Sequence, residues 1–188
     1  MHAEAGVVPA PGNGGLPDPS LFAGKYLDPH KHFAYSFTVS GGNLMAWGGI
    51  LRRVGPNQFK DLGTGTITFE NSDGGMKATL VTDGETFFAG KRIDAPHLSE
   101  ADLAGYAGQY RSTEIDTTYD LSIGSGGLLL RNKWNPPLKL TVIAPDEFES
   151  GDVGILVFRR DANHRVSGLS MFTVNARDVN FERSTEWH

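Results

Sequence analysis

The sequence predicts an all-β protein built from two tandem eight-stranded antiparallel β-barrels. Three observations lead to this prediction. Apolar residues alternate with polar residues at a period of two in many short runs. Many of the 24 glycines and 10 prolines fall between these runs, where tight turns need them. The same motifs also occur twice in the same order along the 188 residues, which indicates an internal repeat.

Two copies of about 80 residues each carry the matched segments. The distance between matched segments grows in two steps along the chain, from 84 residues (22 to 106) to 89 (51 to 140) and then to 93 (88 to 181). The matched pairs are "FAGKY" (22–26) with "YAGQY" (106–110), "GGNLMA" (41–46) with "GGLLLR" (126–131), "LRRVGPNQF" (51–59) with "LTVIAPDEF" (140–148), and "FFAGKR" (87–92) with "NFERS" (180–184).

The growing offset locates two insertions in the second copy. Each adds about four residues relative to the first copy. One falls near "NKWNPP" (132–137), and the other lies between Asn163 and Phe181. We expect these to be the places where the two barrels differ most.

Each copy shows the alternation of half-buried strands. In "FAYSFTV" (33–39) and "TTYDLSI" (117–123), large apolar residues occupy every second position. Counting the runs between turns predicts about eight short strands per copy. The exception is "HLSEADLAGY" (97–106), where Ser99 followed by Asp102 predicts a capped helical turn.

Eight short strands with one apolar face can hide that face and both sheet edges by closing into a barrel. Such a barrel is just wide enough to be filled by side chains or to hold one small ligand. We favour filled barrels, because the large inward candidates suffice. They are Tyr26, Phe33, Tyr35, Phe37, Leu44, Phe59 and Phe69 in the first copy, and Tyr110, Tyr119, Leu129, Phe148 and Phe158 in the second.

The predicted organisation has four parts. Residues 1–20 are rich in Pro, Gly and Ala, without a basic start or an apolar core, which indicates a linker and not a signal peptide. Residues 21–93 form the first barrel, 94–101 the interdomain link, and 102–188 the second barrel. A linker at the start leads us to expect a larger preceding protein.

Composition excludes several classes of function. The net charge is −5, which argues against nucleic acid and anionic membranes as partners, since both need a basic face. No apolar run approaches the roughly 20 residues of a membrane span. The chain has no cysteine, so disulfides, thiolate metal sites and thiol nucleophiles are excluded.

The motifs of self-contained catalysis are missing from the sequence. It contains no Ser-x-x-Lys and no Gly-x-Ser-x-Gly, and its glycine pairs lack the following lysine of a phosphate loop. His30 and His32, with Asp28 close by, are metal-ligand residue types, but we expect an exposed hairpin loop there. We therefore predict no catalytic residue, no metal and no cofactor.

Six features of the second copy follow one another over residues 102–184. They are "DLAGYAGQYRS", an aromatic strand with Tyr119, "GGLLL", "PDEF", "VFRRD" and "NFER". This series resembles the β-barrel domain appended to serine hydrolases of the β-lactamase and penicillin-binding-protein superfamily. The first copy, 21–93, matches more loosely.

Two barrels after a hydrolase domain are the architecture of the bacterial D-aminopeptidases of this superfamily. Their catalytic domain carries the Ser-x-x-Lys nucleophile that this sequence lacks. The resemblance therefore implies non-catalytic accessory domains that pack on a serine hydrolase domain, in cis or as a fragment. The parent enzyme would be a D-aminopeptidase or an esterase. Dimerisation is a further role, and location in the bacterial cytoplasm or periplasm stays open.

The resemblance also implies that one loop of the second barrel reaches into the hydrolase cleft and restricts the substrates. The insertion at 132–137 presents Trp134 and Asn135 beside two prolines, and Asp152 could face a cationic substrate amine. These three residues are the gating candidates. The alternatives are that Trp134 plugs a barrel end and that Asp152 is a solvated turn residue.

An alternative function for the whole chain is an independent lipocalin-like barrel that binds a small hydrophobic ligand. It is distinguished from the accessory role by ligand binding to the purified chain.

Overall fold

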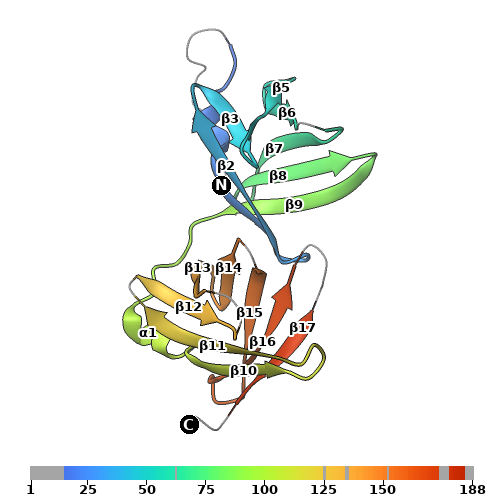
Figure 1. Ribbon diagram of the computed structural model, residues 1–188. Helices are drawn as coiled ribbons and strands as arrows, with labels where there is room; N and C mark the ends of the chain where they lie inside the picture. The colour runs from blue at the N-terminus through green and yellow to red at the C-terminus, as the bar shows by residue number, and fades with distance from the viewer. Residues whose placement is uncertain are drawn as a thin grey trace, which may run out of the picture. The chain divides into compact units, whose positions relative to one another are not determined.

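The computed structural model describes residues 15–61, 63–124, 126–133, 136–151, 153–173 and 178–184. It confirms the all-β prediction, with one closed eight-stranded antiparallel barrel and one nearly closed barrel (Figure 1). The chain divides into two compact units. The first comprises residues up to Asp28 together with Ala34–Arg92, and the second comprises Pro29–Phe33 together with the chain from Ile93 onward. The predicted boundaries of linker, barrels and link stay predictions.

The first unit holds a short 3-10 helix and a nine-stranded sheet in the order β4-β3-β2-β1-β9-β8-β7-β6-β5. Its elements are η1 (Pro19–Phe22), β1 (Gly24–Asp28), β2 (Phe33–Ser40), β3 (Asn43–Ala46), β4 (Gly49–Ile50), β5 (Arg52–Arg53), β6 (Gln58–Lys60), β7 (Thr66–Ser72), β8 (Gly75–Thr82) and β9 (Glu85–Ile93).

Leu51 joins the two edges of this sheet. β4 pairs with β3 and β5 pairs with β6, yet only Leu51 separates β4 from β5 in the chain. The Leu51 amide donates to the carbonyl of Leu44 at 2.8 Å, and its side chain is buried. β4 and β5 thus act as one interrupted strand, so eight strand segments surround the core, as the sequence predicts.

The second unit begins with helix α1 (Glu100–Ala104), which has the predicted capping box of Ser99 and Asp102. Eight strands then form a closed barrel in chain order, because β10 pairs with both β11 and β17. The strands are β10 (Gly108–Ser112), β11 (Thr117–Gly124), β12 (Gly127–Arg131), β13 (Leu138–Ala144), β14 (Glu147–Ser150), β15 (Gly154–Arg160), β16 (Val166–Phe172) and β17 (Val179–Arg183).

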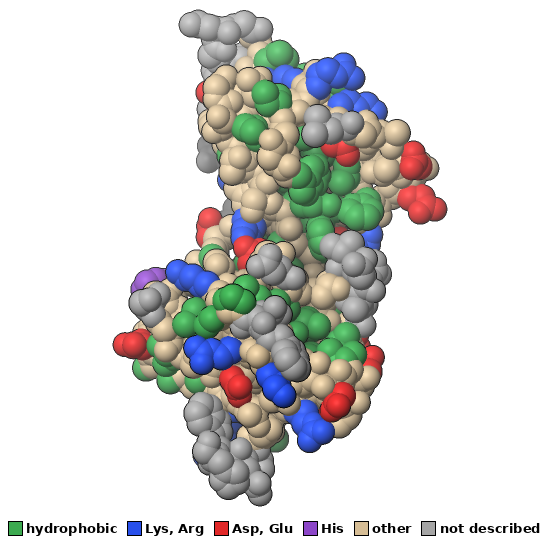
Figure 2. All heavy atoms as spheres, in the orientation of Figure 1, with side chains coloured by type: hydrophobic (Ala, Val, Ile, Leu, Met, Phe, Trp, Pro, Cys, Tyr) green, Lys and Arg blue, Asp and Glu red, His purple; other side chains and the backbone are tan. Residues whose placement is uncertain are grey.

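Side chains fill both barrels. All predicted inward residues are buried except Phe33, which is half-buried, and Leu129. Aromatic rings in the first unit meet mainly edge to face, as in the pair of Tyr26 and Phe37 at 5.3 Å. Charged side chains of both signs are interspersed on the visible face of each unit, with hydrophobic side chains exposed between them (Figure 2).

The prediction for Leu129 is wrong, because its strand is offset by one residue from the aligned position. Leu44 pairs with Val39 in the first unit, and the corresponding pair in the second unit is Leu128 with Ile123. Two residues link the paired strands in both hairpins, so the true offset is 84 there. The run of glycines concealed this shift, and one residue moves a side chain to the other face.

The same hydrogen bond anchors the first strand in each unit. The Tyr26 hydroxyl donates to the carbonyl of Phe22 at 3.0 Å, and the Tyr110 hydroxyl donates to the carbonyl of Tyr106 at 2.7 Å. Burial raises the pKa of both tyrosines to about 12, so both remain donors at neutral pH. The repeated aromatic-Ala-Gly-polar-Tyr motif therefore has a structural role, because its tyrosine holds the start of the first strand in each unit.

A second backbone hydrogen bond is shared by the two units, at positions that are 89 residues apart in the sequence. The amide of Phe69 donates to the carbonyl of Asn57 at 2.9 Å, and the amide of Phe158 donates to that of Asp146 at 2.8 Å. The "PNQF" and "PDEF" motifs thus bind their neighbouring strands in the same way. The two units therefore share these two hydrogen bonds, one at a sequence offset of 84 residues and one at 89.

A polar network closes one end of the second barrel, which we call its base. Tyr106 donates to Oδ1 of Asp146 at 2.8 Å, and the Arg160 guanidinium donates to both oxygens of Asp146 at 2.7 to 3.0 Å. Arg160 also donates to the Tyr106 hydroxyl at 3.0 Å. These hydrogen bonds from Arg160 hold the pKa of Asp146 below its ordinary value of 3.8.

We predict that Asp146→Asn weakens the fold and flattens its acid sensitivity. A carboxylate with a depressed pKa stabilises fully above its unfolded pKa of about 3.9, and this contribution is lost as the pH falls through the folded pKa. The variant should lose about 1 kcal/mol of unfolding free energy at pH 7 and less than that below pH about 3. Urea unfolding over this pH range measures the difference.

The matched control is Asp116→Asn, since Asp116 also has positive φ but its side chain is 90% exposed. If Asp146→Asn lost the same unfolding free energy at pH 7 and at pH about 3, the result would contradict the ionic role of the network.

Gly151, in the β14–β15 connection, and Gly154, the first residue of β15, provide a second prediction. Gly154 has φ +98°, and a Cβ there would overlap the carbonyl oxygen of Phe172, whereas a Cβ on Gly151 meets nothing within 4 Å. Gly154→Ala should cost at least about 1–3 kcal/mol of unfolding free energy, and Gly151→Ala less than about 0.5 kcal/mol. Similar urea midpoints for the two variants would show that the backbone at Gly154 is not constrained.

Candidate functional site

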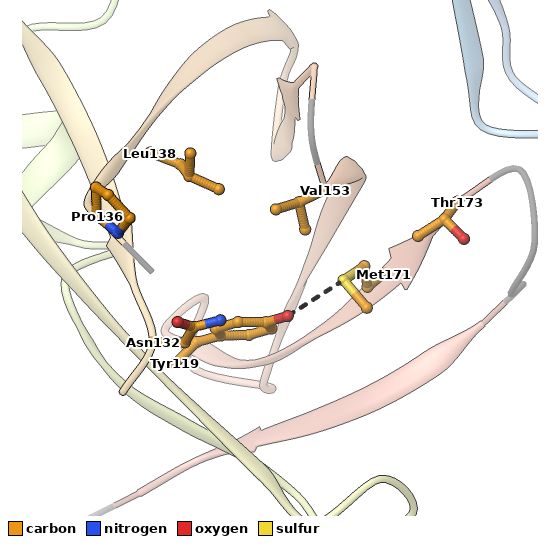
Figure 3. Close-up of a pocket in the computed structure, with 7 residues that line it drawn as sticks. All are labelled: Tyr119, Asn132, Pro136, Leu138, Val153, Met171 and Thr173. Carbon is orange, nitrogen blue, oxygen red and sulfur yellow. Dashed lines mark hydrogen bonds between the residues drawn. The ribbon is translucent and has the colours of Figure 1, made fainter. Parts of the chain in front are cut away.

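A pocket of about 550 Å³ lies at the opposite end of the second barrel, which we call its mouth. The mouth is where the β12–β13, β14–β15 and β16–β17 connections lie. In Figure 3 the lining side chains converge from these connections and from the ends of the adjoining strands. They are Tyr119, Asn132, Pro136, Leu138, Val153, Met171 and Thr173.

Tyr119 lines this pocket with its ring and hydroxyl (Figure 3). Its ring stacks on Phe181, with centroids 5.0 Å apart and a tilt of 32°. Its hydroxyl donates to the sulfur of Met171 at 4.0 Å (Figure 3), and thioether sulfur is a weak acceptor. Burial raises the pKa of Tyr119, so the phenol stays protonated. The lining therefore combines the Tyr119 hydroxyl and the polar side chains of Asn132 and Thr173 with apolar walls.

Hairpin length explains why the pocket lies in the second barrel. In the first unit, two residues connect Ala46 to Gly49, and two connect Thr82 to Glu85. In the second unit, six residues separate β12 from β13, and six separate β16 from β17. Both of these longer connections lie at the mouth.

The first of them, between β12 and β13, coincides with the predicted insertion at 132–137, because Met45 pairs with Ile50 whereas Leu129 pairs with Lys139. The β16–β17 connection contains no insertion, because the pair Ala78 and Gly90 and the pair Leu169 and Phe181 are equally far apart in the sequence; its strands only pair over fewer residues. The extra residues predicted between Asn163 and Phe181 lie instead in the β15–β16 connection at the base, where Phe158 pairs with Leu169 while Phe69 pairs with Ala78.

The corresponding end of the first barrel is closed by an aromatic contact. Trp47, in the two-residue hairpin between β3 and β4, meets Tyr35 edge to face at 4.6 Å. Tyr35 also contacts Phe88 at 4.6 Å, and burial raises its pKa to about 12. Tyr35 is 84 residues before Tyr119, so the two tyrosines occupy equivalent places. In the first barrel the indole of Trp47 covers Tyr35, whereas in the second barrel Tyr119 lines a pocket.

The gating candidates Trp134, Asn135 and Asp152 lie outside the described residues. Their neighbours Pro136 and Val153 both line the pocket. The role of the three candidates stays a prediction.

Sequence reasoning identified the connections at the mouth but missed the residues of the pocket itself. Tyr119 was expected only as a core residue, while Leu138 and Met171 carried no signal of their own. The available signal was the insertion at 132–137, which lengthens a connection at the mouth.

We searched the described residues for metal-binding groups and for an activated serine. They contain no cluster of three or more His, Asp or Glu side chains placed to hold a metal. Ser170 donates to Oδ1 of Asn180 at 2.9 Å and accepts from Arg159 at 2.9 Å, so its hydroxyl has no general base beside it. Within the same ranges, no helix has the length and apolarity needed to cross a membrane.

Comparison with known proteins gives a distant relationship to larger enzymes. No protein-family model matches the chain. The chain is 26% identical over 207 residues to a D-aminopeptidase of Brucella melitensis biotype 1, and 26% identical over 211 residues to a D-aminopeptidase of Brucella ovis. Both alignments cover 97% of this chain and 37% of the relative. The chain thus spans little more than a third of the length of these relatives.

Proposed function

We propose that this chain forms the non-catalytic accessory barrels of a D-aminopeptidase-like serine hydrolase, where they pack on the catalytic domain and restrict substrate access. The observation that carries the proposal is the unequal coverage of the alignment. Nearly the whole chain matches the relatives, while 37% of each relative is matched. The remainder of such an enzyme has room for a separate catalytic domain.

The second barrel is the better candidate for the contact with the catalytic cleft. Its mouth carries the β12–β13 connection of six residues, whereas the corresponding hairpin of the first barrel has two. Loops that a rigid barrel projects can reach a neighbouring domain without disturbing the sheet. We therefore assign substrate restriction to Trp134, Asn135 and Asp152.

The finer parts of the proposal follow from the resemblance. The catalytic domain would belong to the β-lactamase and penicillin-binding-protein superfamily and supply a Ser-x-x-Lys nucleophile. Two hydrogen bonds occur in both barrels, the tyrosine hydroxyl bond at an offset of 84 residues and the phenylalanine amide bond at an offset of 89 residues. They support an origin of the two barrels by duplication of one. Dimerisation through the barrels stays a prediction.

The genomic reading frame upstream of Met1 tests the class of parent protein. We expect an in-frame domain with Ser-x-x-Lys before residue 1, and the chain alone should not hydrolyse D-amino-acid p-nitroanilides. Hydrolysis by the purified chain, or an unrelated upstream frame, would overturn the proposal.

The gating role predicts a change in selectivity in the complete hydrolase. Trp134→Ala should raise kcat/KM for a D-alanyl peptide by roughly 10-fold relative to D-alaninamide, because removing an indole from the cleft admits a longer substrate. Turnover of D-alaninamide, the smallest substrate, should stay within about twofold. Steady-state kinetics with both substrates measures the ratio.

Trp47→Ala is the matched control, since it removes an indole from a two-residue hairpin of the first barrel. An unchanged ratio in Trp134→Ala, or the same change in Trp47→Ala, would exclude gating by Trp134.

A further inference from the structure

We propose that the mouth pocket of the second barrel binds an uncharged aromatic molecule that carries one hydrogen-bond acceptor, and that Tyr119 donates to this acceptor. The proposal concerns the second barrel alone. It does not rest on the accessory role.

The walls of the pocket favour an uncharged ligand. Pro136, Leu138, Val153 and Met171 provide apolar surface, and the described lining residues carry no charged group. An ion placed against this lining would lose hydration without gaining a partner of opposite charge, which is costly. A volume of about 550 Å³ lies within the usual range of about 300–1,000 Å³ for small-molecule sites.

Tyr119 supplies the specific interaction. Phe181 fixes the plane of its ring, so the hydroxyl has a defined position. The present acceptor of that hydroxyl is a thioether sulfur at 4.0 Å, which is far weaker than a carbonyl oxygen. A ligand carbonyl can therefore replace the sulfur with a gain in hydrogen bonding. The hydroxyl can also accept a hydrogen bond, but a ligand acceptor uses the proton that the sulfur holds only weakly.

The first barrel indicates why the ligand should be aromatic. Tyr35 occupies the corresponding place there, and the indole of Trp47 covers it edge to face at 4.6 Å. In the second barrel the two-residue hairpin that carries Trp47 is replaced by a six-residue connection, and a pocket is present. The sulfur of Met171 adds a group that contacts aromatic rings favourably. An aromatic ligand would thus restore the kind of contact that the chain itself supplies in the first barrel.

The test is a titration of the whole chain, labelled with 13C at its methionine methyl groups, using acetophenone and ethylbenzene as probes. The two probes are similar in size, and only acetophenone has a carbonyl. The Met171 methyl signal should shift saturably with both, while those of Met45 and Met76, which lie in the first unit, stay in place. Acetophenone should bind roughly 3- to 10-fold more tightly than ethylbenzene.

Two variants examine the role of the hydroxyl. Tyr119→Phe should bind both probes with equal affinity, because it keeps the ring and removes the donor. Tyr35→Phe, the matched variant in the first barrel, should retain the preference for acetophenone. The unmoved Met45 and Met76 signals report in each variant that the first unit keeps its fold.

Three results would overturn the proposal. The first is the absence of a saturable Met171 shift with either probe in the unmodified chain. The second is a preference for acetophenone that survives in Tyr119→Phe. The third is tighter binding of phenethylammonium than of acetophenone, which would show that a charged group governs the site.

Discussion

Pairing of the first barrel strand with the last, β10 with β17, is the constraint on which the second unit depends. Tyr110 pairs with both Tyr119 and Arg183, so β10 has hydrogen-bonded neighbours on both sides. Closure removes the sheet edges, and it fixes the number and register of the strands. The first unit achieves nearly the same closure by running its chain through Leu51, between the two edge strands. In both units, differences can then accumulate only where the strands turn.

The two ends of the closed second barrel differ in their contacts. At the base, the Tyr110 hydroxyl and the network of Tyr106, Asp146 and Arg160 bind the chain before β10 to the turns that follow β13 and β15. At the mouth, the β12–β13 connection is longer than its counterpart in the first barrel, and Tyr119 lines a pocket. The base resembles that of the first barrel in its contacts, so we assign stability to the base and binding to the mouth.

Much of the fold follows from the sequence, because alternation and turn residues act locally. The strand over 33–39 and the capping box of Ser99 were predicted directly from such patterns. Leu129 was misplaced because a run of glycines aligns equally well at two offsets, and only the pairing of Ile123 with Leu128 decides between them. Tyr119 was predicted to face inward, but its pocket depends on loops that meet only after the barrel closes. The metal-ligand types near His30 formed no three-residue group among the described residues.

We infer that the mouth of the second barrel faces the cleft of a hydrolase domain. Photo-cross-linking from residue 134 tests this contact, with Trp134 replaced by p-benzoylphenylalanine in the complete hydrolase. We expect cross-links to catalytic-domain peptides around the Ser-x-x-Lys motif, and none to that motif when residue 47 carries the cross-linker. Cross-links from residue 134 that reach only the barrels would contradict it.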